Sequence, residues 1–407
     1  MKIRAGVFFG GASVEHEVSV ITAMQAIGAM DENKYQIIPV YVSKAGEFYT
    51  GEHLKKLETY RDIPAAIAQA QKVVLAKQKD QTVLVLEKQK PFGSSVVATL
   101  DVALPIFHGT GGEDGTMQAH FERLDLPYTG PDVCASAIGM DKWAMKAMFN
   151  IAGVPCLPGV KTGRGAYYTD PDAAMDEIER KIGYPVIVKP YNLGSSVGIG
   201  KARDRQALEA ALEEAFRYAE YALCERAITK LREINCSVLG DADETCASVC
   251  EEPLNATDFL TYADKYQSGG GSKGSKGAKS GGESGGGMSS LARKVPADLP
   301  EETAAKIRQM CADAFRAINA AGVCRVDCMI DGESGEIFVN EINTIPGSLS
   351  FYLWEATGLS FTALMDELVR LALKRQRQRK QLQFSFDTNL LSTAQLGGAK
   401  GSKGAKR

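Results

Sequence analysis

Residues 322–347 constrain the fold most, because each of two strand-like runs here places a pair of charged or amide side chains two residues apart. The first run is Gly-Val-Cys-Arg-Val-Asp-Cys-Met-Ile, and the second is Ile-Phe-Val-Asn-Glu-Ile-Asn. Side chains alternate between the faces of a strand, so Arg325 and Asp327 share one face, and Glu341 and Asn343 share one face of the next. The turn formers between the runs predict a hairpin that places Asp327 opposite Glu341 and Asn343.

The residue types on this hairpin indicate a metal-bound phosphate. Magnesium prefers hard oxygen ligands and needs few of them from protein, so Asp327, Glu341 and Asn343 suit Mg²⁺ that carries a nucleotide. Arg325 beside them adds positive charge for the same ligand. The alternative is a surface hairpin with solvated acidic side chains.

Composition excludes several classes of function. The 407 residues suggest two or three domains, and 44% hydrophobic and 24% charged residues are typical of a globular chain. A net charge of −3 gives no basic field for nucleic acid. No apolar run approaches the ~18 residues that a membrane span needs. The basic and then apolar start resembles a signal peptide, but Glu15, His16 and Glu17 follow too soon, so we expect a buried first strand.

Cysteine usage predicts a reducing compartment. The nine cysteines are scattered and show no CxxC spacing. Cys246/Cys250 and Cys324/Cys328 form CxxxC pairs inside strand-like runs. We interpret them as buried free thiols, and we expect a cytoplasmic protein without a membrane partner.

Short apolar runs separated by helix-length segments predict an α/β fold for the first ~140 residues. A second unit contains further strands, and residues 306–321 show helical spacing, with Gly322 at the position of a C-terminal cap. The predicted strands are 3–9, 37–42 and 102–107 in the first unit, and 186–189 and 222–225 in the second.

Two segments have low complexity. Residues 269–287 hold ten glycines, four serines and three lysines, a composition typical of a flexible insertion. The basic, Gly/Lys-rich tail 376–407 contains the hexapeptide Gly-Ser-Lys-Gly-Ala-Lys at 401–406, and the same hexapeptide occurs at 274–279.

A strand that ends in Lys189 leads into a glycine-rich loop, 192–201. Its glycines let backbone amides approach an anion, and Ser195 and Ser196 add hydroxyl donors. The loop fits neither the P-loop nor the GxGxxG pattern, so an ordinary hairpin turn stays open beside phosphate binding.

Two further strands run into glycine turns and helix starts, which are ligand-binding positions in α/β sheets. One carries His108 and the other carries Glu15 and Glu17. The alternatives are a structural histidine and acids that complement a helix dipole.

Together these segments resemble the D-alanine–D-alanine ligase family of the ATP-grasp superfamily, over about residues 1–375. The resemblance implies a three-lobed ATP-grasp fold of α/β (α+β) class with a Rossmann-like N-terminal domain. The expected parts are 1–141, a central ATP-grasp subdomain 142–225, and a catalytic domain 226–375 with the insertion. The motifs are Phe9-Gly-Gly-Ala-Ser-Val-Glu-His-Glu-Val-Ser19, His108-Gly-Thr-Gly-Gly-Glu-Asp-Gly-Thr116, Met140-Asp-Lys142, Lys189-Pro-Tyr-Asn-Leu-Gly-Ser-Ser-Val-Gly198, Arg325-Val-Asp327 and Asn340-Glu-Ile-Asn-Thr-Ile-Pro-Gly347.

The resemblance implies ATP as a substrate and two Mg²⁺ or Mn²⁺ ions. Lys142 and Lys189 would contact the ATP phosphates, while Glu225 and Glu233 would hold the adenine amino group and the ribose hydroxyls. The other nucleotide-side residues would be Lys265, Ser195 and Ser196, and the metal ligands would be Asp327, Glu341 and Asn343.

The implied reaction joins two D-alanines through an acyl phosphate, for peptidoglycan precursors. Phosphorylation supplies a leaving group, and transfer needs positioning and charge neutralisation. Glu15 would bind the first ammonium near His108, and Ser195 and Tyr266 would close over the reacting atoms. Arg325 and the Gly347 amide would stabilise the oxyanion. A homodimer is expected from the family alone.

Departures from the family pattern leave rivals open. The insertion follows Tyr266 directly, and the loop after Gly347 is about four residues shorter than is common, so Ser348 or Ser350 would replace the serine that grips the second carboxylate. A ligase that joins D-alanine to D-serine or D-lactate is the closest rival, although Lys265-Tyr266 favours D-alanine. A non-catalytic nucleotide-binding scaffold is the remote one.

Overall fold

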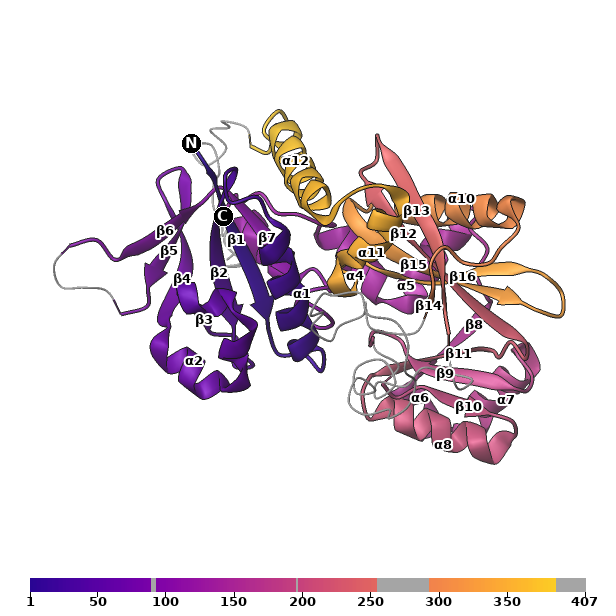
Figure 1. Ribbon diagram of the computed structural model, residues 1–407. Coiled ribbons are helices and arrows are strands. Elements are labelled where there is room, and N and C mark those ends of the chain that lie inside the picture. Colours follow the sequence, from indigo (N-terminus) through magenta and orange to yellow (C-terminus); the bar gives the residue numbers. More distant parts are fainter. Residues whose placement is uncertain (89–92, 195–196, 255–292, 386–407) are drawn as a thin grey trace, which may run out of the picture.

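The computed structural model describes residues 1–88, 93–194, 197–254 and 293–385, and within these ranges the strands form three sheets (Figure 1). No helix in these ranges is long and apolar enough to cross a membrane. The mixed α/β architecture confirms the predicted fold class.

The first sheet has the strand order β6-β5-β4-β3-β2-β1-β7. Its centre is apolar because β1, β2 and β7 are buried on both faces, as expected for parallel strands. The strands are β1 (Ile3–Gly10), β2 (Tyr35–Val42), β3 (Phe48–Thr50), β4 (Gln71–Gln78), β5 (Gln81–Leu86), β6 (Val96–Leu100) and β7 (Val102–Ile106), and the helices of this part are α1 (His16–Ala29), η1 (Glu52–Lys55), η2 (Leu57–Arg61), α2 (Ile63–Gln69), α3 (Thr116–Arg123) and α4 (Val133–Met140).

The second sheet has the antiparallel order β10-β9-β11-β8. One face packs on α7 and α8 through an apolar cluster, and the other face carries Lys189 and Glu225. The strands are β8 (Gly159–Gly163), β9 (Val186–Pro190), β10 (Gly200–Ala202) and β11 (Tyr221–Arg226), and the helices are α5 (Lys142–Ile151), α6 (Arg164–Thr169), α7 (Pro171–Lys181) and α8 (Arg205–Phe216).

The third sheet has the order β14-β13-β12-β15-β16, and its last two strands are the predicted hairpin. The expected helix begins at Glu301, five residues early, and ends at Ala317. Gly322 is therefore not its cap but opens β15, where a Cβ atom would lie 2.7 Å from the Cα of Gly130. The elements are β12 (Leu231–Gly240), β13 (Thr245–Pro253), β14 (Arg293–Lys294), α10 (Glu301–Ala317), β15 (Gly322–Asp331), β16 (Ile337–Asn343), η4 (Gly347–Ser350), α11 (Phe351–Thr357) and α12 (Phe361–Arg379).

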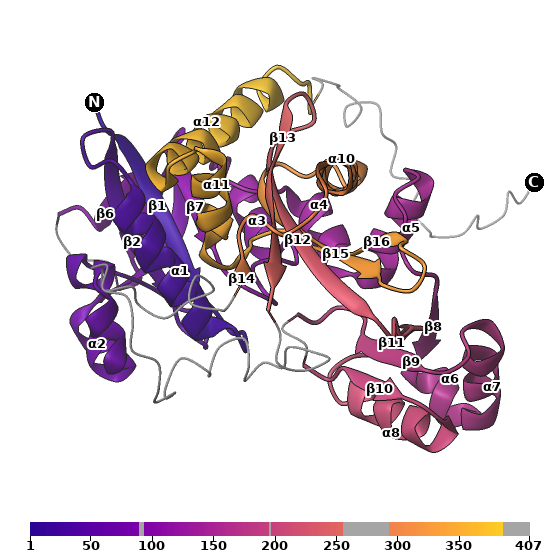
Figure 2. The same cartoon turned by 45° about the vertical axis from the view of Figure 1, so that its right-hand side comes forward.

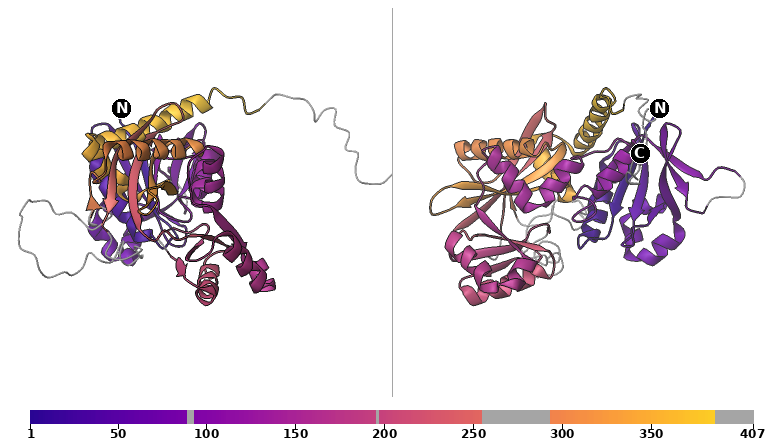
Figure 3. Two further views of the ribbon diagram at one scale, coloured as in Figure 1. Left: turned by 90° about the vertical axis from the view of Figure 1, so that its right-hand side faces the viewer. Right: turned by 180° about the vertical axis from the view of Figure 1, so that it is seen from behind.

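Two helices, α12 and α5, pack against a sheet other than the one nearest to them in the sequence or against two sheets. α12 lies between the first and third sheets (Figures 1 and 3), and its buried face joins the apolar cluster of β1 and α1. Met145 and Phe149 of α5 pack in the core of the third sheet, although they belong to the predicted subdomain 142–225 and that sheet belongs to 226–375. The predicted domain ranges therefore stay predictions, although each contains most of one sheet.

Candidate active site

The β15–β16 hairpin brings the predicted acidic and amide side chains together. Asp327 pairs directly with Glu341, and Arg325 pairs with Asn343. The guanidinium of Arg325 makes a two-pronged ion pair with Asp327, at 2.6 Å from Nε to Oδ1 and 2.7 Å from Nη2 to Oδ2. The amide of Asn343 donates to Oδ2 of the same carboxylate at 3.1 Å. The prediction that these four residues share one face is confirmed.

Burial and opposite charge compete at Arg325. Burial alone lowers the pKa of its guanidinium, but the Asp327 carboxylate overcomes that effect and raises the pKa well above its usual value. Tyr352 and Glu251 act in the same direction. Arg325 is therefore a permanent cation, suited to an anionic ligand or a developing oxyanion.

Two lysines from the preceding part reach this hairpin. Nζ of Lys142, at the start of α5, lies 3.5 Å from Oε2 of Glu341 and donates to the carbonyl of Leu193 at 2.8 Å. Lys189, at the end of β9, donates to Oδ1 of Asn340 at 3.0 Å. The predicted phosphate-contacting lysines thus lie beside the predicted metal ligands.

A buried carboxylate holds Lys189 in place. Glu225 of β11 is 1% exposed and forms ion pairs with Lys146 and, at 2.7 Å, with Lys189. Burial alone would raise the pKa of Glu225, but the two ammonium groups lower it below the usual range. Glu225 thus balances the charges of the two lysines, and its predicted adenine contact stays a prediction.

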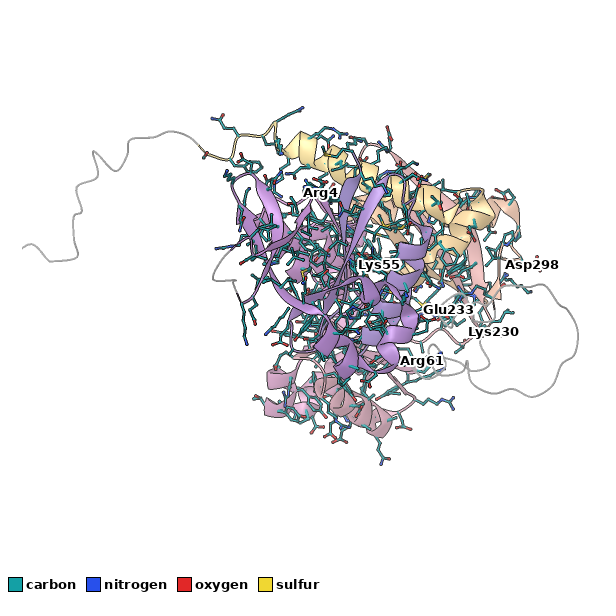
Figure 4. All side chains as sticks on the ribbon, turned by 60° about the vertical axis from the view of Figure 1, so that its left-hand side comes forward. Arg4, Lys55, Arg61, Lys230, Glu233 and Asp298 are labelled. Carbon is teal, nitrogen blue, oxygen red and sulfur yellow. The ribbon has the colours of Figure 1, made fainter. Side chains whose placement is uncertain are left out.

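Glu233 lies on β12, where Figure 4 shows it with Lys230 near the beginning of the strand. Burial lowers the pKa of Lys189, but Glu225, followed by Glu341 and then Glu233, raises it above its usual value. Glu233 stands two residues before Asn235, which pairs with Asp327, so Glu233 lies on the same face of the sheet as that predicted metal ligand.

The first sheet contributes Glu15, which lies just before α1. A Cβ atom at Gly109 would lie 2.8 Å from Oε2 of Glu15, and one at Gly194 would lie 3.5 Å from the same oxygen. Glycine at 109 therefore leaves room for the carboxylate, since a side chain there would collide with it, whereas the distance at Gly194 is an ordinary van der Waals contact. Glu15 therefore lies beside Gly194, in the glycine-rich loop 192–201.

His108 connects the first sheet to the turn after the hairpin. Its Nδ1 donates to the carbonyl of Ile345 at 2.8 Å, so Nε2 accepts from the hydroxyl of Thr22 at 2.9 Å. The hydroxyl oxygen of Thr22 in turn accepts the backbone N–H of Ser348 at 3.1 Å. Burial lowers the pKa of His108, which favours this neutral form.

The turn after Pro346 has an uncommon backbone. Ser348, Leu349 and Ser350 have φ values of 53°, 49° and 52°. Side chains other than glycine rarely adopt this region, so the surroundings must hold the turn. Gly347 opens it, and Ser348 and Ser350 are both buried, which leaves the choice between them open.

Glu113 forms a second link between the same segments. Its Oε2 accepts the N–H of Gly109 at 2.8 Å, and its Oε1 accepts the N–H of Ile345 at 3.0 Å. Burial, followed by the charge of Glu15, raises the pKa of Glu113 to about 8. The folded protein thus retains a proton that the unfolded chain releases near pH ~4.3.

This proton predicts a pH-dependent stability. Because the folded state binds the Glu113 proton more tightly, its stabilisation by that proton is complete below pH ~4.3 and is lost as pH rises through about 8. Glu113→Gln cannot titrate, so the melting temperature of the wild type minus that of the variant should decrease between pH 5.5 and 8.5. Differential scanning calorimetry measures it, and a difference that does not change with pH would contradict the prediction.

The hairpin, with its two carboxylates and an amide, fits a hard cation only if phosphates complete the coordination. Among the described residues, no three His, Cys, Asp or Glu side chains are arranged to hold a metal. The amide of Asn343 also presents nitrogen to Asp327 here, and it would need to turn its oxygen toward a cation. This donor set suits Mg²⁺ that arrives with a nucleotide.

Four predicted residues, Ser195, Ser196, Lys265 and Tyr266, lie outside the residues that the structure describes, as does the insertion 269–287. Sequence reasoning missed Lys146, which its helical spacing from Lys142 could have signalled. It also missed Thr22, for which no local signal exists. Glu113 stood within a quoted motif but received no role.

Comparison with known proteins identifies the family. Residues 4–131 match the sequence model of the D-ala D-ala ligase N-terminus, and residues 148–280 and 285–370 match that of the D-ala D-ala ligase C-terminus. The chain belongs to the D-Ala–D-Ala ligase family. The resemblance drawn from the motifs is thereby confirmed.

Relatives of this ligase family match over nearly their full length. A D-alanine–D-alanine ligase from Bacillus cytotoxicus is 35% identical over 95% of this chain and 99% of its own. One from Heliobacterium modesticaldum is 37% identical over 94% of this chain and 97% of its own.

Solved structures show the same fold. The D-alanine–D-alanine ligase from Coxiella burnetii matches with a TM-score of 0.74 and 27% identity, over 93% of this chain and 96% of its own. A D-Ala:D-Ser ligase from Enterococcus faecalis matches with a TM-score of 0.73 and 30% identity, over 91% of this chain and 100% of its own. These matches support the predicted ATP-grasp architecture.

Proposed function

We propose that this protein is an ATP-dependent ligase that joins two D-alanines into D-alanyl-D-alanine for peptidoglycan precursors. The observation that carries the proposal is the convergence of Arg325, Asp327 and Glu341 with Lys142 and Lys189 in a chain of this family. The expected compartment is the cytoplasm, and the expected assembly is a homodimer.

The charges suit phosphoryl transfer from ATP to a carboxylate. Lys142 and Lys189 would hold the phosphates, and Asp327, Glu341 and Asn343 would hold Mg²⁺ or Mn²⁺. When bound, the divalent ion supplies neutralisation of the phosphate charge. Phosphoryl transfer then depends on positioning. The hydrogen bonds from Lys142 to Leu193 and from Lys189 to Asn340 would supply it by holding the two ammonium groups in place.

The remaining residues act on the amino acids. Glu15 would bind the ammonium of the first D-alanine and so hold its carboxylate toward the γ-phosphate. The amine of the second D-alanine would attack the acyl phosphate, and Arg325 with the N–H of Gly347 would stabilise the oxyanion. We keep Ser195, Tyr266 and Lys265 as proposed parts of the closing lid, since an acyl phosphate must be shielded from water.

A second candidate function is ligation of D-alanine to D-serine. The match to the D-Ala:D-Ser ligase from Enterococcus faecalis, at 30% identity, is the observation that favours it. The Lys265-Tyr266 pair supports an amino acid acceptor over D-lactate.

Phosphate release with D-alanine as donor, and D-alanine, D-serine or D-lactate as acceptor, tests these assignments. A site built for an amine should use D-lactate at least roughly a hundredfold less efficiently than D-alanine at neutral pH. Mass spectrometry of the products separates dipeptide from depsipeptide. Equal kcat/KM for D-lactate and D-alanine would overturn the amino acid assignment, and higher kcat/KM for D-serine would establish the second candidate.

A further inference from the structure

The third sheet carries a buried polar cluster that the proposed reaction does not use. Glu251 of β13 is 1% exposed, and both of its carboxylate oxygens accept. Oε2 pairs with Nη1 of Arg293 at 2.8 Å, while Oε1 accepts from the amide of Asn235 at 3.1 Å and from the hydroxyl of Tyr352 at 3.0 Å. The guanidinium of Arg293 also lies over the Tyr352 ring, 4.3 Å from its centre.

This cluster lies on the same face as the candidate active site. Asn235 pairs with Asp327 on one side and with Glu251 on the other, and Asp327 pairs with Glu341. Directly opposite residues in antiparallel strands point to one face. A single row therefore crosses four strands, from the predicted metal ligand Glu341 to Glu251.

Tyr352 connects the row to the turn with positive φ. It is the second residue of α11, which follows Ser350 directly and packs against β12 and β13 (Figure 2). Trp354 further fixes the helix, since its Nε1 donates to Oγ of Ser237 at 2.9 Å. The turn is thus held at its beginning by Thr22, which accepts the N–H of Ser348, and beyond its end by Glu251 through Tyr352.

The anchoring matters because the turn is under backbone strain. Ser348, Leu349 and Ser350 all have positive φ, whereas residues other than glycine favour negative φ. Contacts with the surrounding structure must therefore hold these three residues in place. Loss of one anchor would let the turn relax, which would move the N–H groups that follow Gly347. This movement would weaken binding of the second substrate most, because the carboxylate of that substrate is expected at this turn.

We propose that Glu251, Arg293 and Tyr352 are positioning residues that set the shape of the acceptor site by anchoring the shortened turn 347–350. The inference rests on the proposed function, because it assigns these residues to the subsite of the second amino acid. They do not touch the reacting atoms. They act through the turn, so their removal should weaken acceptor binding selectively.

Tyr352→Phe is the decisive variant, because it removes the hydroxyl that donates to Glu251 and keeps the ring beneath Arg293. A hydrogen bond to a charged group is strong enough that its loss should raise the KM for the second D-alanine by roughly tenfold. The KM for ATP and the constant for the first D-alanine should stay within about twofold of wild type. Rates of ADP formation over a range of D-alanine concentrations separate the two alanine constants.

Two further variants distinguish anchoring from general stability. Tyr168→Phe removes a hydroxyl from an exposed tyrosine of α6 and should leave every constant unchanged. Glu251→Gln should raise the same acceptor KM, because a neutral amide weakens the bond from Tyr352 and removes the ion pair with Arg293. Its combination with Tyr352→Phe should be less than additive, because both changes act on the same hydrogen bond.

An acceptor KM within twofold of wild type in Tyr352→Phe would overturn the anchoring role while leaving the ligase function standing. Equal increases in all three constants, together with a lower melting temperature, would also overturn it in favour of a purely structural role. A wild-type protein that forms no ADP with D-alanine or D-serine would overturn the proposed function and this inference together.

Discussion

Glu341→Gln should abolish turnover while the protein stays folded. Glu341 lies opposite Asp327 in the hairpin and 3.5 Å from Nζ of Lys142, so its charge acts on both the predicted cation and the nucleotide. Loss of a carboxylate that holds a catalytic ion typically adds several kcal/mol to the barrier, and about 3 kcal/mol already reduces kcat by roughly a hundredfold. Steady-state ADP formation at saturating ATP and Mg²⁺ measures the effect.

Glu333→Gln is the matched control, because Glu333 lies in the exposed turn of the same hairpin and forms a solvent-exposed ion pair with Lys230, at 3.7 Å. This control should retain wild-type activity. Circular dichroism and the melting temperature establish that both variants are folded. Near-normal turnover in Glu341→Gln would remove Glu341 from the metal site.

Glu225→Gln should destabilise the fold strongly. The substitution preserves shape but leaves the ammonium groups of Lys146 and Lys189, which are 4% and 9% exposed, without their counter-charge. Removal of one partner from a buried ion pair costs about 3–5 kcal/mol. Calorimetry should show a melting temperature lower by several degrees. ATP binding should weaken, because Lys189 loses its ion pair with Glu225 and keeps the bond to Asn340 alone among the two contacts described above.

A surface glutamate supplies the control for this prediction. Glu220 lies 3.8 Å from Arg164 with both side chains about half exposed or more, at 74% and 49%. Glu220→Gln should change stability by no more than about 0.5 kcal/mol, because water screens such pairs. Adding Lys146→Met to Glu225→Gln should restore part of the lost stability, because it removes one of the two uncompensated ammonium groups. Equal melting temperatures for Glu225→Gln and Glu220→Gln would contradict the buried-charge argument.

Local periodicity was enough to predict the hairpin and which of its side chains share a face. Arg325 and Asp327 stand two residues apart in one strand, and Glu341 and Asn343 stand two apart in the next. Because the side chains of a strand alternate between its faces, each pair shares a face. A short turn then leaves few possible registers. The buried first strand and the placement of the CxxxC pairs within strands follow from the same kind of local signal. Cys250, Cys324 and Cys328 are buried as expected, but the expectation is wrong for Cys246, which is exposed.

Only the tertiary structure could decide which distant groups support that hairpin. Glu113 reaches the N–H of Ile345 across 232 residues, and Thr22 reaches that of Ser348 across 326. Gly322 illustrates the same limit: its sequence position suggested a helix cap, whereas the close approach of Gly130 explains the glycine. Periodicity reports the direction of a side chain along one element, and it contains no information about which other element lies beyond it. The pairing of Glu225 with Lys146 and Lys189, and of Glu251 with Tyr352, therefore depends on how the three sheets and their helices pack.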